Sequence, residues 1–394
     1  MAPMTDPRTL RDRDIVCVGF ADWDSELWTN QHHLMSRLAR HNRVLFIESL
    51  GLRRPQLARR DLTRIARRLR RGLAPPRAVD GLHVLSPLVL PFHGYAAARE
   101  LNARLLPALV RRALRRLDFG PNPILWAYVP QAEALLQTLA PELVIYHCVD
   151  DMAAQAGIDA NAFRAAEERF AARADLVLAS APTLAARMRT LSSNVLYAPN
   201  VADTELFATA LAPGSPDPAL AALPAPRIVF TGAIVQTKLD FGLLIALARA
   251  RRAWSFALVG PIGPGDPRTD VTALAAEPNI HLLGARAYSE LPGVLRAADA
   301  GLIPYARNEL TQSIFPMKVY EYLAAGRPVV STPLPALEGV TEVASAPDAE
   351  GIARLLDQAL AEDDAERRAE RSRVAASHSW EQRLREIEAA IGSL

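Results

Sequence analysis

Residues 313–335 read SIFPMKVYEYLAAGRPVVSTPLP, a stretch that predicts a helix leading into a buried strand. Pro316 suits the first turn of a helix, where its missing N–H is not needed. Gly326 suits the position just past the helix end, and Pro328 prevents the helix from continuing. We therefore expect a helix over residues 316–325, followed directly by the strand PVVST.

The same alternation of apolar runs and helical patterns fills most of the 394-residue chain. Near-continuous Val, Ile and Leu runs separated by helical segments are typical of parallel sheets covered on both faces. The first expected strands are IVCVGF (15–20), RVLFIES (43–49), LHVLSPLVL (82–90), ILWAYVP (124–130), LVIYHCV (143–149), LVLASA (176–181) and VLYAPN (195–200). A second set comprises RIVFTGAI (227–234), SFALVGP (255–261), IHLLGA (280–285), GLIPY (301–305) and PVVST (328–332).

Between the two sets, residues 211–226 (LAPGSPDPALAALPAP) hold five prolines and no periodic pattern, which predicts a linker. We expect an α/β protein of two doubly wound, Rossmann-like domains that face each other across a cleft. The first domain is expected at 1–210 and the second at 227–375, with a final helical segment at 376–394 that packs back toward the first. Ligands of such sheets bind outside the carboxyl ends of the strands.

Several classes of protein are not expected from this sequence. No long apolar run predicts a membrane-spanning helix, and the charged first residues do not resemble a signal peptide. The first strand is followed by GFADWD, and neither GxGxxG there nor a P-loop motif occurs, which argues against dinucleotide dehydrogenases and P-loop NTPases. Cys17 and Cys148 each lie in an apolar run, which indicates buried thiols in a reducing compartment. We therefore expect a cytoplasmic protein.

Residues 53–77 are strongly basic. They hold ten arginines against a single acid, Asp61, around a stripe of apolar residues. This pattern is typical of a basic amphipathic helix on an anionic membrane surface, so we expect peripheral association with the inner membrane. The alternative is a helix that docks on its own domain and turns a charged face to solvent. No nucleic-acid-binding motif accompanies the arginines, so nucleic acid is not an expected partner.

Lys318 and Lys238 are the only lysines in a chain with 45 lysines and arginines together. Lys318 falls in the first turn of an expected helix, where the macrodipole already places partial positive charge. A bound anion would make an ammonium favourable there, so Lys318 indicates a phosphate site. Glu321 lies one turn later and could accept hydrogen bonds from ribose hydroxyls, and phosphate with ribose means a nucleotide. The alternative is a surface ion pair between Lys318 and Glu321, worth about 0.2–0.5 kcal/mol.

The segment 313–335 resembles the donor-binding signature of bacterial GT-B glycosyltransferases of the group 1 or family 4 type. The likeness extends to TGAI…K…LL (231–244), YSELPGVLRAADAGLIPY (288–305), LVIYHCVDDM (143–152) and ADLVLASAPTLAARM (174–188). The resemblance implies a GT-B fold and a nucleoside diphosphate sugar as donor, with no metal or other cofactor. It also implies that Glu321 binds the ribose and that the loop with Lys238 holds the diphosphate.

The donor-binding residues expected on these grounds are Lys318, Glu321, Lys238, Ser313, Gly232, Tyr320 and Tyr288. Two positions depart from the retaining members of the family that carry a pair of glutamates. Ser313 stands where the first glutamate is found, and Ala233 stands where an arginine is common. Both departures remove support for a retaining outcome. For Lys238 the alternative is an exposed lysine at the start of a helix.

Asp150 and Asp151 follow the expected strand LVIYHCV and so lie at the carboxyl edge of the first sheet. Paired acids there could supply a general base that takes the proton of an acceptor hydroxyl. The placement resembles that of the catalytic aspartate in inverting glucuronosyltransferases of the xanthan type. We therefore expect Asp150 to be the base and Asp151 to orient or replace it; the alternative is that Asp150 caps the next helix. Glu167 and Glu168 on that helix are expected to face solvent.

Asn30, His32 and His33 open the helix after the first strand and are candidates for the acceptor side of the cleft. Adjacent histidines point to different faces of a helix, so they do not predict a metal site. The alternative is a structural role for one or both of them.

Together, these patterns predict an enzyme that moves a hexosyl or glycuronosyl group from a nucleotide sugar to an acceptor glycan or lipid-linked sugar, in bacterial cell-surface polysaccharide synthesis. Two alternatives stay open. A nucleotide-sugar epimerase of the same fold would turn over without an acceptor. A non-catalytic partner subunit of a glycosyltransferase would show no turnover at all.

Overall fold

The computed structural model describes residues 9–25, 27–50, 74–87, 96–155, 157–264, 266 and 268–394. The chain forms two compact units. Unit 1 comprises Met1–Ala198 together with Leu384–Leu394, and unit 2 comprises Pro199–Arg383. Each unit is built on a largely parallel sheet, as the alternating pattern of the sequence predicts.

The sheet of unit 1 has eight strands in the order β3-β4-β2-β1-β5-β6-β7-β8. They are β1 (Asp14–Val18), β2 (Arg43–Ile47), β3 (Arg77–Val79), β4 (Leu82–Leu85), β5 (Ile124–Ala127), β6 (Leu143–Cys148), β7 (Leu176–Ala179) and β8 (Val195–Tyr197). Neighbouring strands pair in parallel, apart from the antiparallel hairpin of β3 and β4 at one edge. The central strand β1 pairs Ile15 with Val44 on one side and with Ile124 on the other, and all three side chains are buried.

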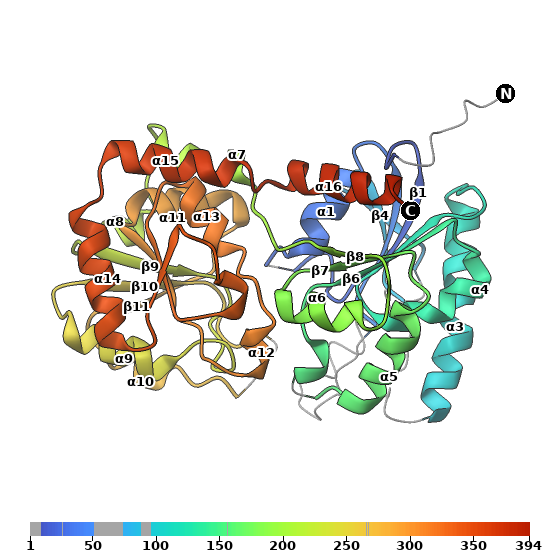
Figure 1. Cartoon of the computed structure of the whole chain (residues 1–394), viewed down its shortest axis with the longest axis horizontal. Coiled ribbons are helices and arrows are strands. Elements are labelled where there is room, and N and C mark those ends of the chain that lie inside the picture. Colours follow the sequence, from blue (N-terminus) through green and yellow to red (C-terminus); the bar gives the residue numbers. More distant parts are fainter. Residues whose placement is uncertain are drawn as a thin grey trace. The chain divides into compact units, whose positions relative to one another are not determined.

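Helices cover both faces of this sheet (Figure 1). One face carries α1 (Asn30–Leu38) and the part of α16 (Trp380–Gly392) that belongs to unit 1; the other carries α3 (Ala96–Arg116), α4 (Leu136–Leu139), α5 (Ala160–Ala171) and α6 (Pro182–Arg189). The short 3-10 helices η1 (Pro130–Leu135) and η2 (Met152–Ala154) lie in the connections. Right-handed crossovers require this arrangement, because the strand order runs in opposite directions before and after β1.

The sheet of unit 2 has six parallel strands in the order β11-β10-β9-β12-β13-β14. They are β9 (Arg227–Thr231), β10 (Ser255–Val259), β11 (Ile280–Gly284), β12 (Ala300–Ile303), β13 (Val329–Ser331) and β14 (Val343–Ser345). The helices are α7 (Thr204–Ala208), η3 (Thr209–Leu211), α8 (Pro218–Ala221), α9 (Phe241–Ala250), α10 (Thr272–Ala275), η4 (Tyr288–Glu290), α11 (Leu291–Ala297), α12 (Glu309–Gln312), α13 (Lys318–Ala324), η5 (Pro335–Leu337), α14 (Ala349–Ala361) and α15 (Ala365–Ala376).

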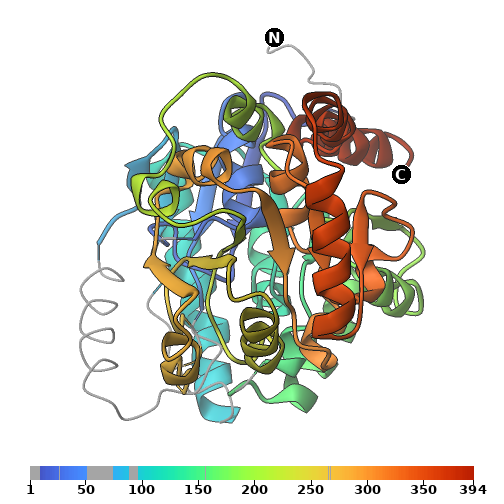
Figure 2. The same ribbon diagram turned by 90° about the vertical axis from the view of Figure 1, so that its left-hand side faces the viewer.

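These helices again divide between the two faces of the sheet, as Figure 2 shows from a second direction. Helices α9 and α14 pack together on one face, whereas α13 lies on the other with α7 and α15 against it. The doubly wound arrangement is therefore present in both units. In unit 2 it brings the turn after β9 next to Lys318, the first residue of α13.

The stretch 211–226 lies inside unit 2, and the chain passes from unit 1 to unit 2 between Ala198 and Pro199. Asp217 explains this difference from the expected linker. Its carboxylate accepts a hydrogen bond from the N–H of Leu220 (2.9 Å) at the start of α8 and forms an ion pair with Arg286 (2.7 Å). These contacts attach the stretch to unit 2. At the other end of the chain, Leu384–Leu394 belong to unit 1, and the N–H of Leu10 donates to Glu388 Oε1 (3.2 Å).

Most of the basic segment 53–77 lies outside the described residues, which resume at Ala74. The last arginine of the segment, Arg77, begins β3, and its Nη2 donates to Asp24 Oδ2 (2.9 Å) and Glu48 Oε1 (3.2 Å). Within the part of the chain that the structure describes, no helix has the length and apolar character to cross a membrane.

Candidate active site

Two glycine turns lie side by side at the carboxyl edge of the sheet in unit 2. Gly232 follows β9 with φ +128°, and Gly260 follows β10 with φ +156°, values that residues with a side chain rarely adopt. The N–H of Gly232 donates to Val259 O (2.8 Å), and a Cβ on Gly260 would lie 1.9 Å from Gly232 O. Because these conformations favour glycine, the two turns present backbone without side chains at this edge of the sheet.

Lys318 lies directly against the Gly232 turn. A Cβ on Gly232 would be 2.7 Å from both Cε and Nζ of Lys318. The ammonium also lies over the ring of Phe230, 5.3 Å from its centroid, in a favourable cation–π contact. Among the described residues, no carboxylate forms an ion pair with Lys318. The expected alternative, an ion pair with Glu321, is therefore absent there, and the ammonium can receive an anion.

Glu321 is buried one turn along α13, with 6% of its surface exposed. Burial raises the pKa of its carboxyl, and the nearby Lys318 ammonium and Tyr288 hydroxyl act in the opposite direction. A carboxylate in such a place is held close to positive charge with little access to water. It can accept hydrogen bonds from a ligand that brings its own hydroxyl donors.

The other expected donor residues lie in different surroundings. Tyr288 begins η4 next to Glu321, with its ring edge-on to Phe207. Tyr320 instead points into the interior, where its ring stacks on His378. Ser313 is buried at the end of α12.

Lys238 lies in the turn after β9, where its C=O accepts the N–H of Ala306 (2.8 Å) and its ammonium has no ion-pair partner in the described chain.

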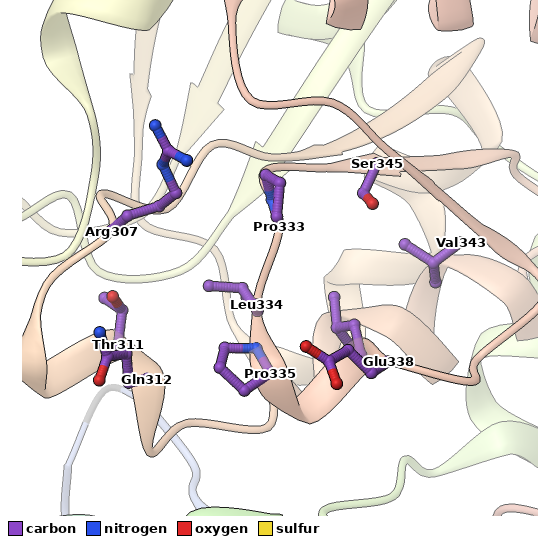
Figure 3. Close-up of a pocket in the computed structure, with 10 residues that line it drawn as sticks. Arg307, Thr311, Gln312, Pro333, Leu334, Pro335, Glu338, Val343 and Ser345 are labelled. Carbon is purple, nitrogen blue, oxygen red and sulfur yellow. The ribbon is translucent and has the colours of Figure 1, made fainter.

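The structure also has a pocket of about 260 Å³ at the carboxyl edge of β12 and β13, which the sequence did not indicate (Figure 3). Its lining residues are Arg307, Thr311, Gln312, Pro333, Leu334, Pro335, Leu337, Glu338, Val343 and Ser345. Three of them come from α12 and the loop before it, five from residues 333–338 in the turn around η5, and Val343 and Ser345 from β14. The lining residues come from separate short segments within 307–345, so no single motif marks the pocket.

In unit 1, Asp150 and Asp151 follow β6 at the carboxyl edge of the sheet, where the sequence places them. Asp150 is half-buried. Asp151 is buried, and its Oδ2 pairs with Arg164 Nη2 (2.8 Å), whereas Oδ1 has no hydrogen-bond partner. Helix α5 is capped by Asp159, whose Oδ1 accepts the N–H of Ala162 (3.1 Å). The pair of aspartates is therefore not used as the cap of that helix.

Glu167 is not solvent-facing, contrary to the expectation from the sequence. Its side chain is 2% exposed, accepts the hydroxyl of Tyr146 at Oε1 (2.6 Å) and forms an ion pair with Arg187. The physical reason is that Arg187 and Tyr146, on α6 and β6, bring a cation and a donor to the inner face of α5. Glu168, the next residue, is exposed as expected.

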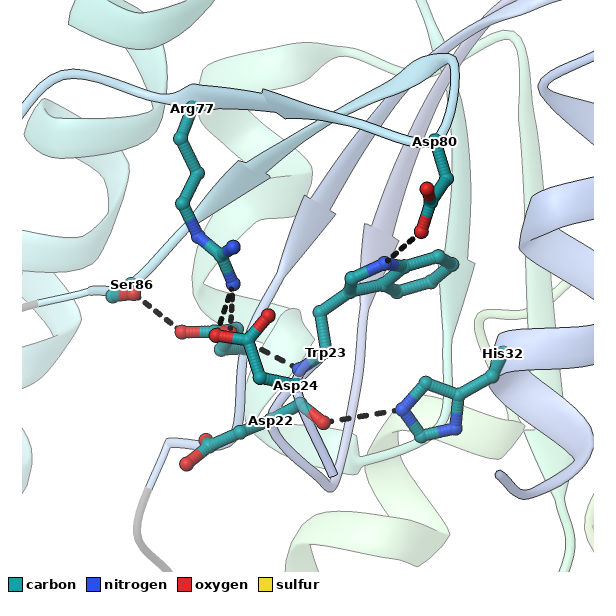
Figure 4. A network of polar contacts seen from close by, with 8 residues as sticks. Asp22, Trp23, Asp24, His32, Arg77, Asp80 and Ser86 are labelled. Carbon is teal, nitrogen blue, oxygen red and sulfur yellow. Dashed lines mark hydrogen bonds and ion pairs between the residues drawn. The ribbon is translucent and has the colours of Figure 1, made fainter. Parts of the chain in front are cut away.

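Asn30, His32 and His33 are all buried inside unit 1. Nδ1 of His32 accepts the N–H of Thr29 (3.1 Å) and Nε2 lies 3.1 Å from Asp22 O, so the ring fastens α1 to the loop after β1 (Figure 4). Burial lowers the pKa of His32 and, more strongly, that of His33. Asn30 Oδ1 accepts the hydroxyl of Tyr128 (3.0 Å).

The same loop connects to a second carboxylate, which sequence reasoning missed. Glu48 is buried just after β2 and accepts the N–H of Trp23 (3.0 Å), the guanidinium of Arg77 (3.2 Å) and the hydroxyl of Ser86. These contacts join four segments of unit 1. We infer that this network holds the carboxyl edge of the first sheet in place.

Comparison with known proteins shows which proteins this chain is similar to. Residues 225–362 match the family model described as Glycosyl transferases group 1. TuaH of Bacillus subtilis (strain 168), whose name assigns it to teichuronic acid biosynthesis, is 29% identical over 231 residues, covering 55% of this chain and 57% of TuaH. The match thus spans a little more than half the length of that relative.

Solved structures match over nearly the whole chain. Anabaena HepE in complex with UDP and glucose gives a TM-score of 0.63 at 14% identity, covering 97% of this chain and 100% of HepE. The α,α-trehalose 6-phosphate synthase of Burkholderia multivorans gives 0.66 at 14% identity, covering 97% and 98%. Such low identities show the fold alone. The chain therefore has the GT-B fold, and its residues 225–362 match the model of the group 1 glycosyltransferases.

Proposed function

We propose that the chain is a glycosyltransferase that moves a sugar from a nucleoside diphosphate sugar to an acceptor hydroxyl in cell-surface polysaccharide synthesis. The observation that carries this proposal is the ammonium of Lys318, which lies against the Gly232 turn and beside the buried Glu321. Fixed positive charge next to bare backbone suits a diphosphate, and a buried carboxylate suits ribose hydroxyls. Two relatives support it: HepE is described with UDP and with UDP-glucose, and TuaH is named for teichuronic acid biosynthesis.

In the proposed donor complex, Lys318 and Lys238 hold the diphosphate, and Glu321 holds the ribose. When the bond between the anomeric carbon and the diphosphate breaks, negative charge grows on the leaving diphosphate. Two ammonium groups already in place stabilise that charge, so we propose that no metal ion is needed. Lysine suits the task because its ammonium is a compact point charge.

Asp150 is the proposed general base. The oxygen of the acceptor hydroxyl forms a bond to the anomeric carbon, its proton passes to the carboxylate, and the diphosphate departs. We assign this role to Asp150 because Asp151 is buried and paired with Arg164. Asp151 then has the secondary role of fixing the loop that carries Asp150.

We further propose that the acceptor is a lipid-linked glycan and that the protein works at the cytoplasmic face of the inner membrane. The nine arginines at 53–71 support this, because each basic residue near an anionic surface contributes about 1 kcal/mol. Co-sedimentation with phosphatidylglycerol vesicles but not with phosphatidylcholine vesicles is expected. Equal recovery with both kinds of vesicle, or with neither, would count against membrane association.

The first test is thermal unfolding with UDP, GDP, dTDP, ADP and CMP, using the wild type, Lys318→Ala and Arg354→Ala. One nucleoside diphosphate, at one hundred to one thousand times its Kd, should stabilise the wild type by about 3–4 kcal/mol. Arg354→Ala removes an exposed cation of α14 and should respond like the wild type. The donor site is misplaced if Lys318→Ala is stabilised to the same extent, and the proposal fails if no nucleotide stabilises the wild type.

A turnover assay then separates the proposed transfer from its alternatives. With a crude lipid acceptor and a radiolabelled nucleotide sugar, label should move into the lipid fraction only when the acceptor is present. Conversion of the nucleotide sugar without any acceptor would identify an epimerase. Nucleotide binding without turnover in either case would identify a non-catalytic partner subunit.

A further inference from the structure

The two segments that connect the units run side by side where they enter unit 2. The chain passes from unit 1 to unit 2 after Ala198 and returns after Arg383. We call residues 199–203 the first connection and residues 377–383 the second. The N–H of Ala202 in the first connection donates to His378 O in the second (3.2 Å), and Ala202 pairs in parallel with Ser379.

Each connection also contacts the residues that lead into α13. From the first connection, Asn200 Nδ2 donates to Phe315 O (2.9 Å). From the second, the ring of His378 stacks on Tyr320 with centroids 4.0 Å apart and planes at 12°. Tyr320 in turn stacks on Phe315 at 5.6 Å and 17°. A continuous line of contacts therefore runs from one connection, past the start of α13, to the other.

The helices next to the connections enclose α13 as well. Helix α7 follows the first connection and α15 precedes the second, and both pack against α13. At the far end of α13, Arg371 of α15 donates to Gly326 O (2.9 Å). Asn200, Phe315 and Tyr320 are all buried, so these contacts cannot be exchanged for contacts with water without a local rearrangement.

We propose that Asn200 and His378 are positioning residues for the ligand that Lys318 holds, and that they couple occupancy of that site to both connections. The proposal rests on the proposed function, because the ligand is the diphosphate of the donor. Neither residue needs to touch the ligand: Asn200 fixes the carbonyl of Phe315 and His378 fixes the ring of Tyr320, and Lys318 lies between these two positions in the chain. Such coupling is reciprocal, so a ligand on Lys318 steadies the connections as much as the connections favour the ligand.

The affinity for UDP, measured by calorimetric titration, tests the positioning role. His378→Ala removes the stacking contact with Tyr320. Asn200→Asp replaces the amide donor by an acceptor of nearly the same shape. Each variant should raise the Kd for UDP roughly three- to tenfold, the usual effect of losing one such contact. His378→Phe keeps a planar ring and should stay within about twofold of the wild type. His281→Ala, a matched loss of a half-buried histidine on β11, should leave Kd unchanged. Equal Kd values in all four variants and the wild type would overturn the proposal.

Amide hydrogen exchange supplies a readout that a purely structural role would not move. In the wild type, UDP should slow exchange in residues 313–326 and also at Ala202, whose N–H joins the two connections. In the double variant Asn200→Asp/His378→Ala, saturating UDP should slow only residues 313–326. The coupling is wrong if the wild type binds UDP while Ala202 exchanges at an unchanged rate. If another nucleotide of the thermal-unfolding panel binds in place of UDP, that nucleotide is used in both experiments; if the wild type binds none of them, the proposed function fails first and this inference falls with it.

Discussion

Gly232 occupies a position where any side chain would collide with the ammonium that defines the site. We predict that Gly232→Ala weakens nucleotide binding at least tenfold, because its Cβ would lie 2.7 Å from Lys318 Nζ. The backbone φ of +128° adds a stability loss of about 1 kcal/mol. Gly339→Ala is the matched control, since its φ is +85° and nothing lies within 4 Å of the added Cβ. It should lose similar stability and bind nucleotide normally, as thermal shift with and without UDP would measure; equal binding losses would contradict the steric argument.

Glu321 illustrates a residue whose functional position costs stability. Burial raises the pKa of its carboxyl above the pKa in the unfolded chain. Between these two pKa values the folded state binds more protons than the unfolded state, so the free energy of unfolding falls as the pH rises through that range. We predict that Glu321→Gln raises the melting temperature of the ligand-free protein at pH 7 and raises it less at pH 4, while weakening nucleotide binding. Glu350→Gln, at an exposed position, should change neither. A destabilised Glu321→Gln at pH 7 would mean that the carboxylate is structural.

At the scale of elements, the buried pair of Glu167 and Arg187 joins α5 to α6 and to β6. We predict that Glu167→Ala destabilises unit 1 by about 3–5 kcal/mol, because Arg187 and the Tyr146 hydroxyl lose their partner in the interior. Glu168→Ala, on the exposed face of the same helix, should change the free energy of unfolding by less than about 0.5 kcal/mol. Urea denaturation of the two variants measures both values, and similar losses would show that helix propensity, not the buried pair, is responsible.

The element pattern was largely predictable because parallel strands are buried on both faces. Each of the twelve expected strands overlaps a strand of the structure. A strand that is buried on both faces needs a run of apolar residues, and such a run can be recognised without knowing which other segments pack against it. The exceptions have physical reasons. β3 (Arg77–Val79) and β14 (Val343–Ser345) are short edge strands with exposed or half-buried residues, so no apolar run marks them. Helix α13 begins at Lys318 rather than at Pro316, because residues 316 and 317 form a preceding turn in which Val319 N donates to Pro316 O (3.2 Å).

The candidate site was predictable only in part. Lys318 and Gly232 were identified from the sequence because a rare lysine near a helix start and a glycine after a strand are local signals. Tyr320 carries no such signal: its ring turns inward onto His378, a residue far away in the sequence. His32 is a candidate for acceptor contact in the sequence, and in the structure both ring nitrogens meet backbone groups of unit 1. Contacts between distant segments decide these cases, and the sequence pattern does not contain them.

The two units should respond to pH to different extents. Burial lowers the pKa of His32 and His33 in unit 1. Below the pKa of an unfolded histidine, the unfolded state therefore binds more protons than the folded state. Unit 1 thus loses stability as the pH falls from the unfolded pKa toward the two lowered pKa values. In unit 2 the raised pKa of Glu321 makes stability grow as pH falls, whereas the burial-lowered pKa of His281 acts in the opposite direction, so the pH dependence of unit 2 should be weaker than that of unit 1. We predict two calorimetric transitions whose order or spacing changes between pH 7 and pH 5.

The transition of unit 2 can be recognised because UDP should raise it and leave the other unchanged. A substitution in each unit provides the controls: His33→Phe should flatten the pH dependence of the first transition, and Glu321→Gln should change that of the second. A single transition that shifts as a whole with pH and with UDP would show that the units unfold together, and would contradict this prediction.

The scarcity of lysine has a consequence for labelling the protein. Since arginine has replaced lysine nearly everywhere, an amine-reactive acylating reagent finds side-chain targets only at Lys238 and Lys318. Both lie in unit 2, and Lys318 is wedged between a glycine turn and an aromatic ring. The acylation rate of Lys318, read as the appearance of one modified peptide in a mass spectrum, thus becomes a footprint of the anion site. A fluorophore attached at Lys238 would sit close to the same edge of the sheet with few competing side-chain amines.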